Sequence, residues 1–332
     1  MKNLFRISGV ILIIILVFSE GCKKSDQGQL LEIISSLGFD IVTPNSAILS
    51  GNITSNSDST ISEWGVCWST DHLPVITDYK VSSVPYNGYV SFTITGLNKQ
   101  SGYYVRAYAT NSTGTAYGEE LSFTTPADLT GETGNVTDAD GNVYQTIGIG
   151  SQIWMVENLK TTKYCNGDII GTTTPATLDI SAEAAPKYQW AFDGDESNVA
   201  TYGRLYTWYA VTDSRNVCPT DWHVPTDAEW TKLTTYLGGE AVAGDKLKET
   251  GITHWTTPNT GSTNETGFTA LPGGYRYLDG SIINIGLVGF WWSSDESSAT
   301  DAYYHYMICY FSYLSKLYDN KKFGLSVRCI KD

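Results

Sequence analysis

Residues 218–233 read CPTDWHVPTDAEWTKL, and they contain the clearest helix start in the chain. Thr226 can accept a hydrogen bond from the backbone of Glu229, whose side chain can reach back to the Thr226 backbone, which is the pattern of a capping box. Asp227 adds a negative charge to the first turn, where the helix dipole favours one. Because His223 lies beside these carboxylates, an active site is the alternative. Such a cap stabilises a helix by roughly 1 kcal/mol without any catalytic role, so a helix start is the prediction.

The composition places the chain among β-rich proteins that work outside the cytoplasm. Its 332 residues suggest two domains. Gly, Thr, Ser, Tyr and Trp are abundant, which is typical of loop-rich β structure with few long helices. The formal net charge of −14 repels phosphate backbones, and no basic stripe with interleaved aromatic residues offsets it. Nucleic acid is therefore not a predicted partner.

The N-terminal segment predicts export and lipid anchoring. An apolar run over residues 10–18 follows two basic residues and is too short to cross a membrane, so residues 1–21 are a predicted signal peptide. Cys22 directly after this segment resembles the lipobox of bacterial lipoproteins. The resemblance implies lipid on Cys22, anchoring to the outer membrane of a bacterial cell envelope, and a solvated tether over residues 22–30. An ordinary secreted protein is the alternative.

Residues 31–126 carry short alternating runs separated by polar turns, which predict a β-sandwich. Leu97 and Tyr103 have the spacing of a tyrosine corner, in which the phenol anchors a turn to the next strand. The runs GVCWST and YYVRAYATNSTGTAYG make this segment similar to the fibronectin type III-like repeats of bacterial envelope lipoproteins. Such repeats mostly act as spacers. A polar segment over residues 127–135, which starts after a Pro and contains Gly, is the predicted linker.

Residues 136–332 form the predicted second domain. Six ordered blocks resemble the Fibrobacter succinogenes major paralogous domain: GNVYQTIGIGSQIWMVENLK, YGRLYTWYAV, CPTDWHVPTDAEWTKL, GFTALPGGYR, GFWWSSDE and GLSVRCIKD. The resemblance implies an α+β fold like that of C-type lectin-like domains, related to formylglycine-generating enzymes. Two short helices are expected, one over residues 202–211 and one starting near Asp227. The predicted fold class of the whole chain is thus mainly β.

The residues of this domain predict no catalytic site, metal or cofactor. The paired cysteines of formylglycine-generating enzymes and the calcium-binding triplets of lectins have no counterpart. The Cys and His residues lack zinc-ligand spacing, and the Asp-x-Asp-Gly-Asn run at 138–142 lacks the distant glutamate of a calcium loop, so it predicts a turn. The lectin-like resemblance also implies a disulfide between Cys218 and Cys329, because a helix cysteine is often tied to the last strand in such folds.

Aromatic residues crowd the segment between Trp255 and Tyr318. In lectin-like folds this part presents ligand contacts, and aromatic side chains give rigid contact area at low entropic cost. Trp292 is predicted to lie in the core, since neighbours in a strand point in opposite directions. A half-buried strand and hairpin is the alternative for much of this segment. The predicted ligand face consists of Tyr275, Tyr277, Trp291, Tyr304 and Tyr306.

These features predict a non-catalytic envelope lipoprotein whose second domain binds a polysaccharide or a surface protein, while the first domain holds it away from the membrane. Two alternatives stay open at this point. An envelope glycan hydrolase would need a pair of buried carboxylates in one cleft. A structural subunit of a surface assembly would need a large apolar patch or an unpaired edge strand.

Overall fold

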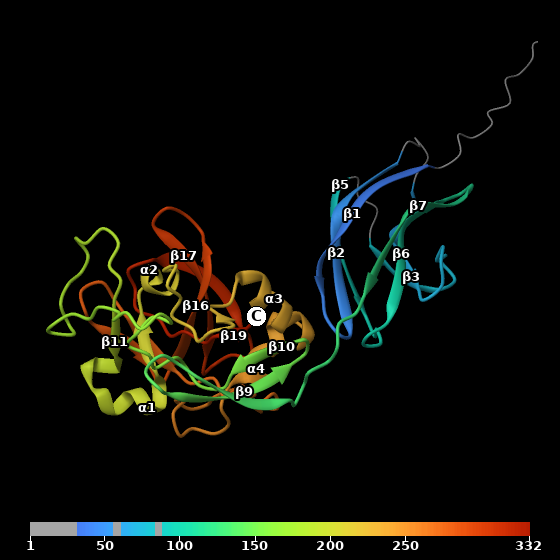
Figure 1. Cartoon of the computed structure of the whole chain (residues 1–332). Coiled ribbons are helices and arrows are strands. Elements are labelled where there is room, and N and C mark those ends of the chain that lie inside the picture. Colours follow the sequence, from blue (N-terminus) through green and yellow to red (C-terminus); the bar gives the residue numbers. More distant parts are fainter. Residues whose placement is uncertain (1–31, 56–60, 84–87) are drawn as a thin grey trace, which may run out of the picture.

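The computed structural model describes residues 32–55, 61–83 and 88–332, which fold as two domains (Figure 1). The predicted signal peptide, Cys22 and the tether lie outside these residues. Within the described ranges, no helix is both long and apolar enough to span a membrane. The fold is mainly β, with antiparallel sheets and short helices, as predicted.

The first domain is a sandwich of two antiparallel sheets, ordered β1-β2-β5 and β4-β3-β6-β7. Its core lies between the sheets and includes Trp64, Phe92 and Val105, because alternate residues of each strand point inward. The strands in the described part are β1 (Ile33–Val42), β2 (Ser46–Ser55), β3 (Glu63–Ser69), β4 (Tyr79–Ser83), β5 (Gly88–Thr95), β6 (Gly102–Asn111) and β7 (Gly114–Thr124).

The tyrosine corner forms at the turn before β6. The Tyr103 hydroxyl oxygen accepts a hydrogen bond from the Asn98 backbone N–H at 2.9 Å, and the Tyr103 ring is buried beside Leu97 in the core. The spacing of Leu97 and Tyr103 therefore predicted this contact correctly.

The predicted linker is shorter in the structure. Strand β8 (Thr133–Thr137) begins inside the segment 127–135, and pairs with β9 (Val143–Ile149). Leu129 already donates its backbone N–H to the Gly150 carbonyl oxygen at 2.6 Å. Pairing with β9, which comes later in the chain, thus extends the second domain into the polar residues.

The second domain surrounds two five-stranded sheets, ordered β13-β19-β10-β9-β8 and β15-β14-β16-β17-β18, with a small β11-β12 ladder. Its remaining strands are β10 (Gln152–Met155), β11 (Gln189–Ala191), β12 (Arg204–Tyr206), β13 (Trp222–His223), β14 (Gly273–Arg276), β15 (Ile282–Ile285), β16 (Val288–Glu296), β17 (Asp301–Ile308), β18 (Ser315–Asn320) and β19 (Ile330–Lys331). Its helices are α1 (Val199–Tyr202), α2 (Trp208–Val211), α3 (Asp227–Tyr236) and α4 (Glu240–Leu247), with 3-10 turns η1 (Phe192–Gly194) and η2 (Glu196–Asn198).

The β14–β18 sheet is covered on both faces over part of its length. On one face, Trp291 and Met307 pack with Trp230 of α3 in a buried cluster. On the other face, Trp292 packs with Tyr206 in a second cluster, and its indole N–H donates to the Tyr206 carbonyl oxygen at 2.8 Å. Both adjacent tryptophans are therefore core residues.

The single helix predicted over residues 202–211 is wrong in its first half. Leu205 lies in β12, opposite Trp190 of β11, and only α2 is helical within the second half. The Tyr206 backbone N–H donates to the Leu325 carbonyl oxygen at 2.8 Å. Pairing with distant segments overrides the weak helical periodicity here. Helices α1 and α4 were not predicted.

Candidate functional site

The helix start within residues 218–233 is confirmed. The Thr226 hydroxyl accepts the Glu229 backbone N–H at 3.2 Å, and the Glu229 carboxylate accepts the Thr226 backbone N–H at 2.8 Å. Helix α3 then buries Trp230 and Leu233 against the β14–β18 sheet. The capping box thereby orients a helix that supports this sheet from one side.

His223 and Asp227, the titratable side chains nearest this cap, have partners in the fold. His223 lies 2.9 Å from Glu229 and 2.5 Å from Asp332. Asp227 accepts from Lys316 at 2.9 Å and lies 3.2 Å from His305. The hydrogen bond from His305 is the main cause that lowers the pKa of the Asp227 carboxyl. These carboxylates hold elements together, so the geometry gives no support to an active site here.

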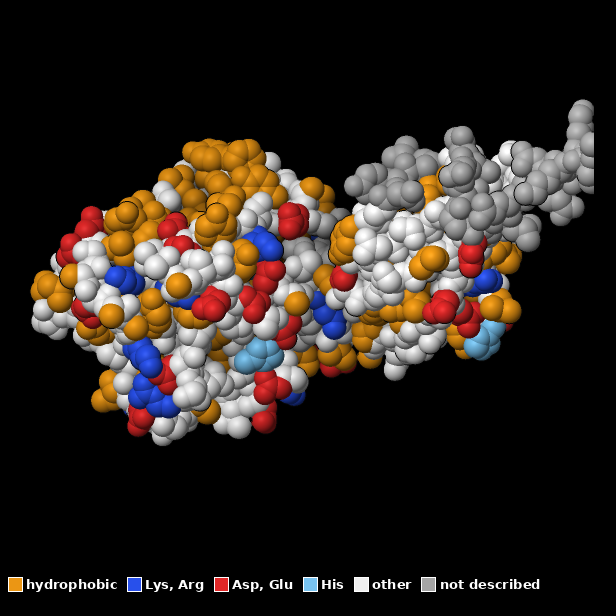
Figure 2. Space-filling view, turned by 90° about the horizontal axis from the view of Figure 1, so that it is seen from above, with side chains coloured by type: hydrophobic (Ala, Val, Ile, Leu, Met, Phe, Trp, Pro, Cys, Tyr) orange, Lys and Arg blue, Asp and Glu red, His pale blue; other side chains and the backbone are white. Residues whose placement is uncertain are grey.

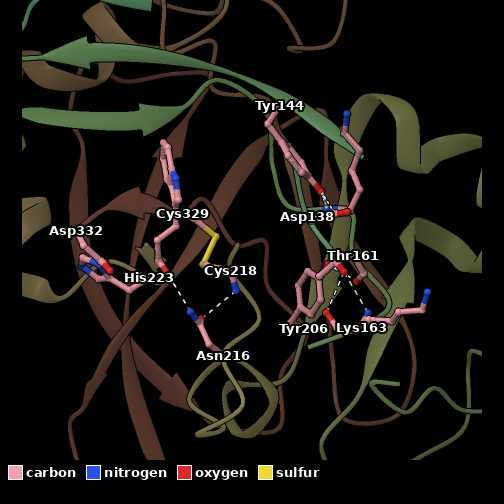
Figure 3. Close-up of a disulfide and its surroundings, with 12 residues drawn as sticks. Asp138, Tyr144, Thr161, Lys163, Tyr206, Asn216, Cys218, His223, Cys329 and Asp332 are labelled. Carbon is pink, nitrogen blue, oxygen red and sulfur yellow. Dashed lines mark hydrogen bonds and ion pairs between the residues drawn. A yellow bond between two sulfur atoms is a disulfide. The ribbon is translucent and has the colours of Figure 1, made fainter. Parts of the chain in front are cut away.

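The disulfide implied by the lectin-like resemblance is present. Cys218 and Cys329 are bonded and buried, and they tie the segment before α3 to the segment before β19 (Figure 3). The Cys218 backbone N–H donates to the Asn216 side-chain oxygen at 2.9 Å, and the Asn216 amide donates to the Trp222 carbonyl oxygen at 2.8 Å. Among the described cysteines, Cys67, Cys165 and Cys309 are free.

The Thr226 cap makes a measurable contribution to stability. Thr226→Ala is expected to lower the free energy of unfolding by about 1 kcal/mol, because the Glu229 N–H loses its acceptor. Urea denaturation checks this, with Thr231→Ala as the control, since Thr231 lies inside the same helix and caps nothing. A loss in the Thr226 variant no larger than in the control would show that the cap is unimportant.

Side chains that could bind a metal ion are not clustered in the described part of the chain. No group of three or more His, Cys, Asp or Glu side chains is arranged to hold a metal ion there. The run at 138–142 folds as a turn: Asp138 accepts the backbone N–H groups of Asp140 and Asn142 at 2.9 Å and the Tyr144 hydroxyl at 2.6 Å (Figure 3). The Asp138 carboxylate is thus used within its own loop.

Aromatic side chains on the β14–β18 sheet and its loops touch one another in an unbroken line, which we call the aromatic strip. Phe290 of β16 lies opposite Tyr306 of β17, and Tyr304 shares their face because residues two apart in a strand point the same way. Successive ring centroids lie 4.9 to 6.2 Å apart. In order, the strip consists of Tyr277, Phe323, Tyr275, Phe290, Tyr304, Tyr306, Tyr313 and Phe311.

The strip is partly open to solvent. Tyr277 and Phe311 at its ends are 38% and 47% exposed, Tyr306 is half-buried, and Tyr304 and Phe323 are buried. Figure 2 shows hydrophobic side chains gathered in a large patch on the surface of the second domain. A contiguous exposed apolar patch marks an interaction site more often than a single exposed apolar residue does.

A small pocket opens in the middle of the aromatic strip. It has a volume of about 120 Å³, and Leu325, which is buried, contributes to its wall. This volume is below the usual range of ligand pockets, roughly 300 to 1,000 Å³, so it suits one functional group of a larger ligand. The pocket is lined by Tyr275, Asn284, Phe290, Tyr304, Asp319, Phe323 and Leu325.

Asp319 gives this pocket a negative charge. Burial raises the pKa of its carboxyl above the usual value, and the nearby Asp301 acts in the same direction. Burial likewise raises the pKa of Tyr304 to about 12, with a further contribution from the Asp319 charge. One Asp319 oxygen accepts the Asn320 backbone N–H at 2.8 Å. The pocket therefore combines aromatic walls with a carboxylate in a partly desolvated position.

The sequence of this domain matches a known family. Residues 147–331 match the family described as the Fibrobacter succinogenes major domain. This match spans more than half of the chain and includes the whole aromatic strip. The chain belongs to this family. A comparison of this Fibrobacter succinogenes major domain protein with curated proteins found no match.

Two solved structures show distant similarity to this family member. The sensor domain of the anti-sigma factor RsgI4 from Pseudobacteroides cellulosolvens is 18% identical, with a TM-score of 0.23, and the match covers 30% of this chain and 76% of that one. The fibronectin type III domain of a human fibronectin type III domain-containing protein 3 is 20% identical, with a TM-score of 0.21, and covers 32% of this chain and 94% of that one.

The Fibrobacter succinogenes major domain brings four of the five predicted ligand-face residues together. Tyr275, Tyr277, Tyr304 and Tyr306 all belong to the aromatic strip. Trp291 does not, because it is fully buried on the opposite face of β16, 6.5 Å from the Trp230 ring. The assignment of Trp291 to the ligand face is therefore wrong. The alternation of side chains in a strand correctly placed Trp291 and Trp292 on opposite faces of the sheet. Both faces are covered by other elements at this point, so both side chains are buried.

Several pocket residues were missed from the sequence. Phe290 could have been found, since it lies two residues before Trp292 and so shares its face. Asp319 and Phe323 gave no signal, because they come from β18 and from the turn after it, and the fold of the sheet brings both to Tyr275 of the distant strand β14. Asn284 likewise joins the pocket from the edge strand β15.

Proposed function

We propose that this protein is a non-catalytic lipoprotein of the bacterial cell envelope whose second domain binds a glycan or a protein ligand through the aromatic strip. The observation that carries the proposal is the unbroken line of rings with a pocket at its centre. Aromatic rings dominate binding energetics at interfaces because they bury large area with few rotatable bonds.

The rest of the chain suits a display role. Lipid on Cys22 would hold the N-terminus at the outer membrane, and the sandwich of the first domain would place the second domain beyond it. The Asp227, Glu229 and Asp332 carboxylates are engaged in the fold, which favours binding over hydrolysis at the helix start. Surface adhesion is the cellular activity that this arrangement serves.

Alanine at exposed or half-buried positions of the strip tests the proposal. We expect Tyr277→Ala and Tyr306→Ala each to weaken ligand binding by about 2 kcal/mol or more, roughly thirtyfold, because an aromatic contact with the ligand is lost. A glycan and surface-protein array identifies the ligand, and titration of each variant then measures the dissociation constant. Melting temperatures are measured alongside, so that loss of binding is separated from loss of fold.

Tyr318→Ala is the matched control for these variants. Tyr318 is 59% exposed in β18 and lies opposite Tyr303, on the face of the strand away from the strip. This variant should bind like the parent protein. If Tyr277→Ala and Tyr306→Ala also bind like the parent, the strip is not the ligand face.

A further inference from the structure

The Asp319 carboxylate has no cationic partner among the described residues. Burial and the like-charged Asp301 raise the pKa of this carboxyl, and the hydrogen bond from the Asn320 N–H lowers it. The lysines nearby in sequence are used elsewhere: Lys316 binds Asp227 at 2.9 Å and Lys321 binds Glu296 at 2.8 Å. A partly buried carboxylate without a counter-charge is unfavourable for the fold. A ligand that brings positive charge would remove this cost.

The rings around Asp319 suit a cation as well. Tyr275, Phe290 and Phe323 line the pocket. The centroid of the Tyr275 ring lies 5.1 Å from that of Phe290 and 5.5 Å from that of Phe323. The faces of aromatic rings carry negative electrostatic potential and attract ammonium groups within about 6 Å. Rings and carboxylate therefore favour the same sign of charge, and the chain's net charge of −14 adds long-range attraction for a basic partner.

The hydrogen-bonding groups of the pocket match an alkylammonium group. Such a group has three N–H donors and no acceptor. Among the described residues, the phenol oxygens of Tyr275 and Tyr304 have no hydrogen-bond partner, and neither does the second carboxylate oxygen of Asp319. These three oxygen atoms belong to side chains that line one pocket of about 120 Å³. The lining side chains therefore carry as many unpartnered acceptor oxygens as an alkylammonium group has N–H donors.

We infer that this pocket binds the ammonium group of a lysine side chain presented by a protein partner. The inference rests on the proposed binding function of the aromatic strip and narrows its ligand to a protein. Lysine fits because its four-carbon stem packs along apolar surface while its compact charged end reaches a polar site. The small volume takes the end of a side chain rather than a whole sugar ring.

Small probes test this inference on the purified full chain. Nα-acetyl-lysine amide is titrated against the protein by NMR, beside its Nε-acetylated form, choline and glucosamine. We expect Nα-acetyl-lysine amide to bind with shifts at the pocket residues, and Nε-acetylation to weaken it at least tenfold because the charge is lost. Equal binding of the acetylated and free forms would overturn the inference. Tighter binding of glucosamine or choline than of the lysine probe would overturn the assignment to lysine.

The Asp319→Asn variant provides a second test of the inference. This change keeps the shape and the acceptor for Asn320 but removes the charge, so the lysine probe should bind at least tenfold more weakly. Asp71→Asn, an exposed change in the first domain, alters the net charge equally and should have no effect. If strip variants lose the array ligand but Asp319→Asn does not, this inference fails and the proposed function stands. If the strip variants also retain the array ligand, the proposed function fails as well.

The melting temperature distinguishes a ligand-binding carboxylate from a structural one. Because the fold raises the pKa of Asp319, the folded state favours the protonated form, and the charged form weakens the fold at neutral pH. Asp319→Asn should therefore keep or raise the melting temperature at pH 7. A marked fall would assign Asp319 a structural role and contradict the inference.

Discussion

Replacing both Cys218 and Cys329 with alanine is expected to lower the free energy of unfolding by about 4 to 5 kcal/mol. The bond closes a loop with a sequence separation of 111 residues, and a cross-link over about 100 residues removes roughly that much chain entropy from the unfolded state. The bond also ties the segment before β13 to the segment before β19, so its loss loosens two paired strands at once. Urea denaturation of the double variant measures the change.

Two further measurements serve as controls for this result. Reducing the parent protein should reproduce the loss of the double variant, because the disulfide is the shared difference. Cys165→Ser should leave stability nearly unchanged, since Cys165 is a half-buried free thiol. A double variant within about 1 kcal/mol of the parent would mean that the unfolded chain gains little freedom when the bond is removed.

Trp291→Ala is expected to cost about 3 to 5 kcal/mol of stability, the usual range for removing a large buried aromatic side chain. Trp291 is fully buried, and its indole N–H donates to the Asn158 side-chain oxygen at 2.8 Å. The same oxygen accepts from Arg328 at 2.8 Å, and burial lowers the pKa of that guanidinium to about 9. The change would leave a cavity beside a buried cation. Thermal and urea denaturation measure the loss.

Variants on the two faces of β16 should have different effects, one on stability and the other on ligand binding. Trp291→Phe, which keeps an aromatic ring but loses the indole N–H bond and part of the ring volume, should cost less than Trp291→Ala. Tyr306→Ala on the opposite face should instead reduce ligand binding. A Trp291→Ala variant that melts like the parent and fails to bind ligand would return Trp291 to the ligand face.

Local rules predicted the elements whose interactions lie within a few residues. The Thr226–Glu229 capping box spans one helical turn, and the Leu97–Tyr103 corner spans one connection between strands. The Cys218–Cys329 bond was available only through the resemblance to lectin-like folds. The helix over residues 202–211 failed because β12 finds hydrogen-bond partners far along the chain.

The sequence by itself determined the class of the fold, because the alternation of side chains in a strand and the capping of a helix depend on near neighbours. It also identified four of the five tyrosines in the aromatic strip. Only the tertiary structure decided that Trp291 is covered by α3, and that Asp319 and Phe323 join Tyr275 around one pocket. The physical reason is that burial of a sheet face, and the charge beside it, depend on which distant segments pack there.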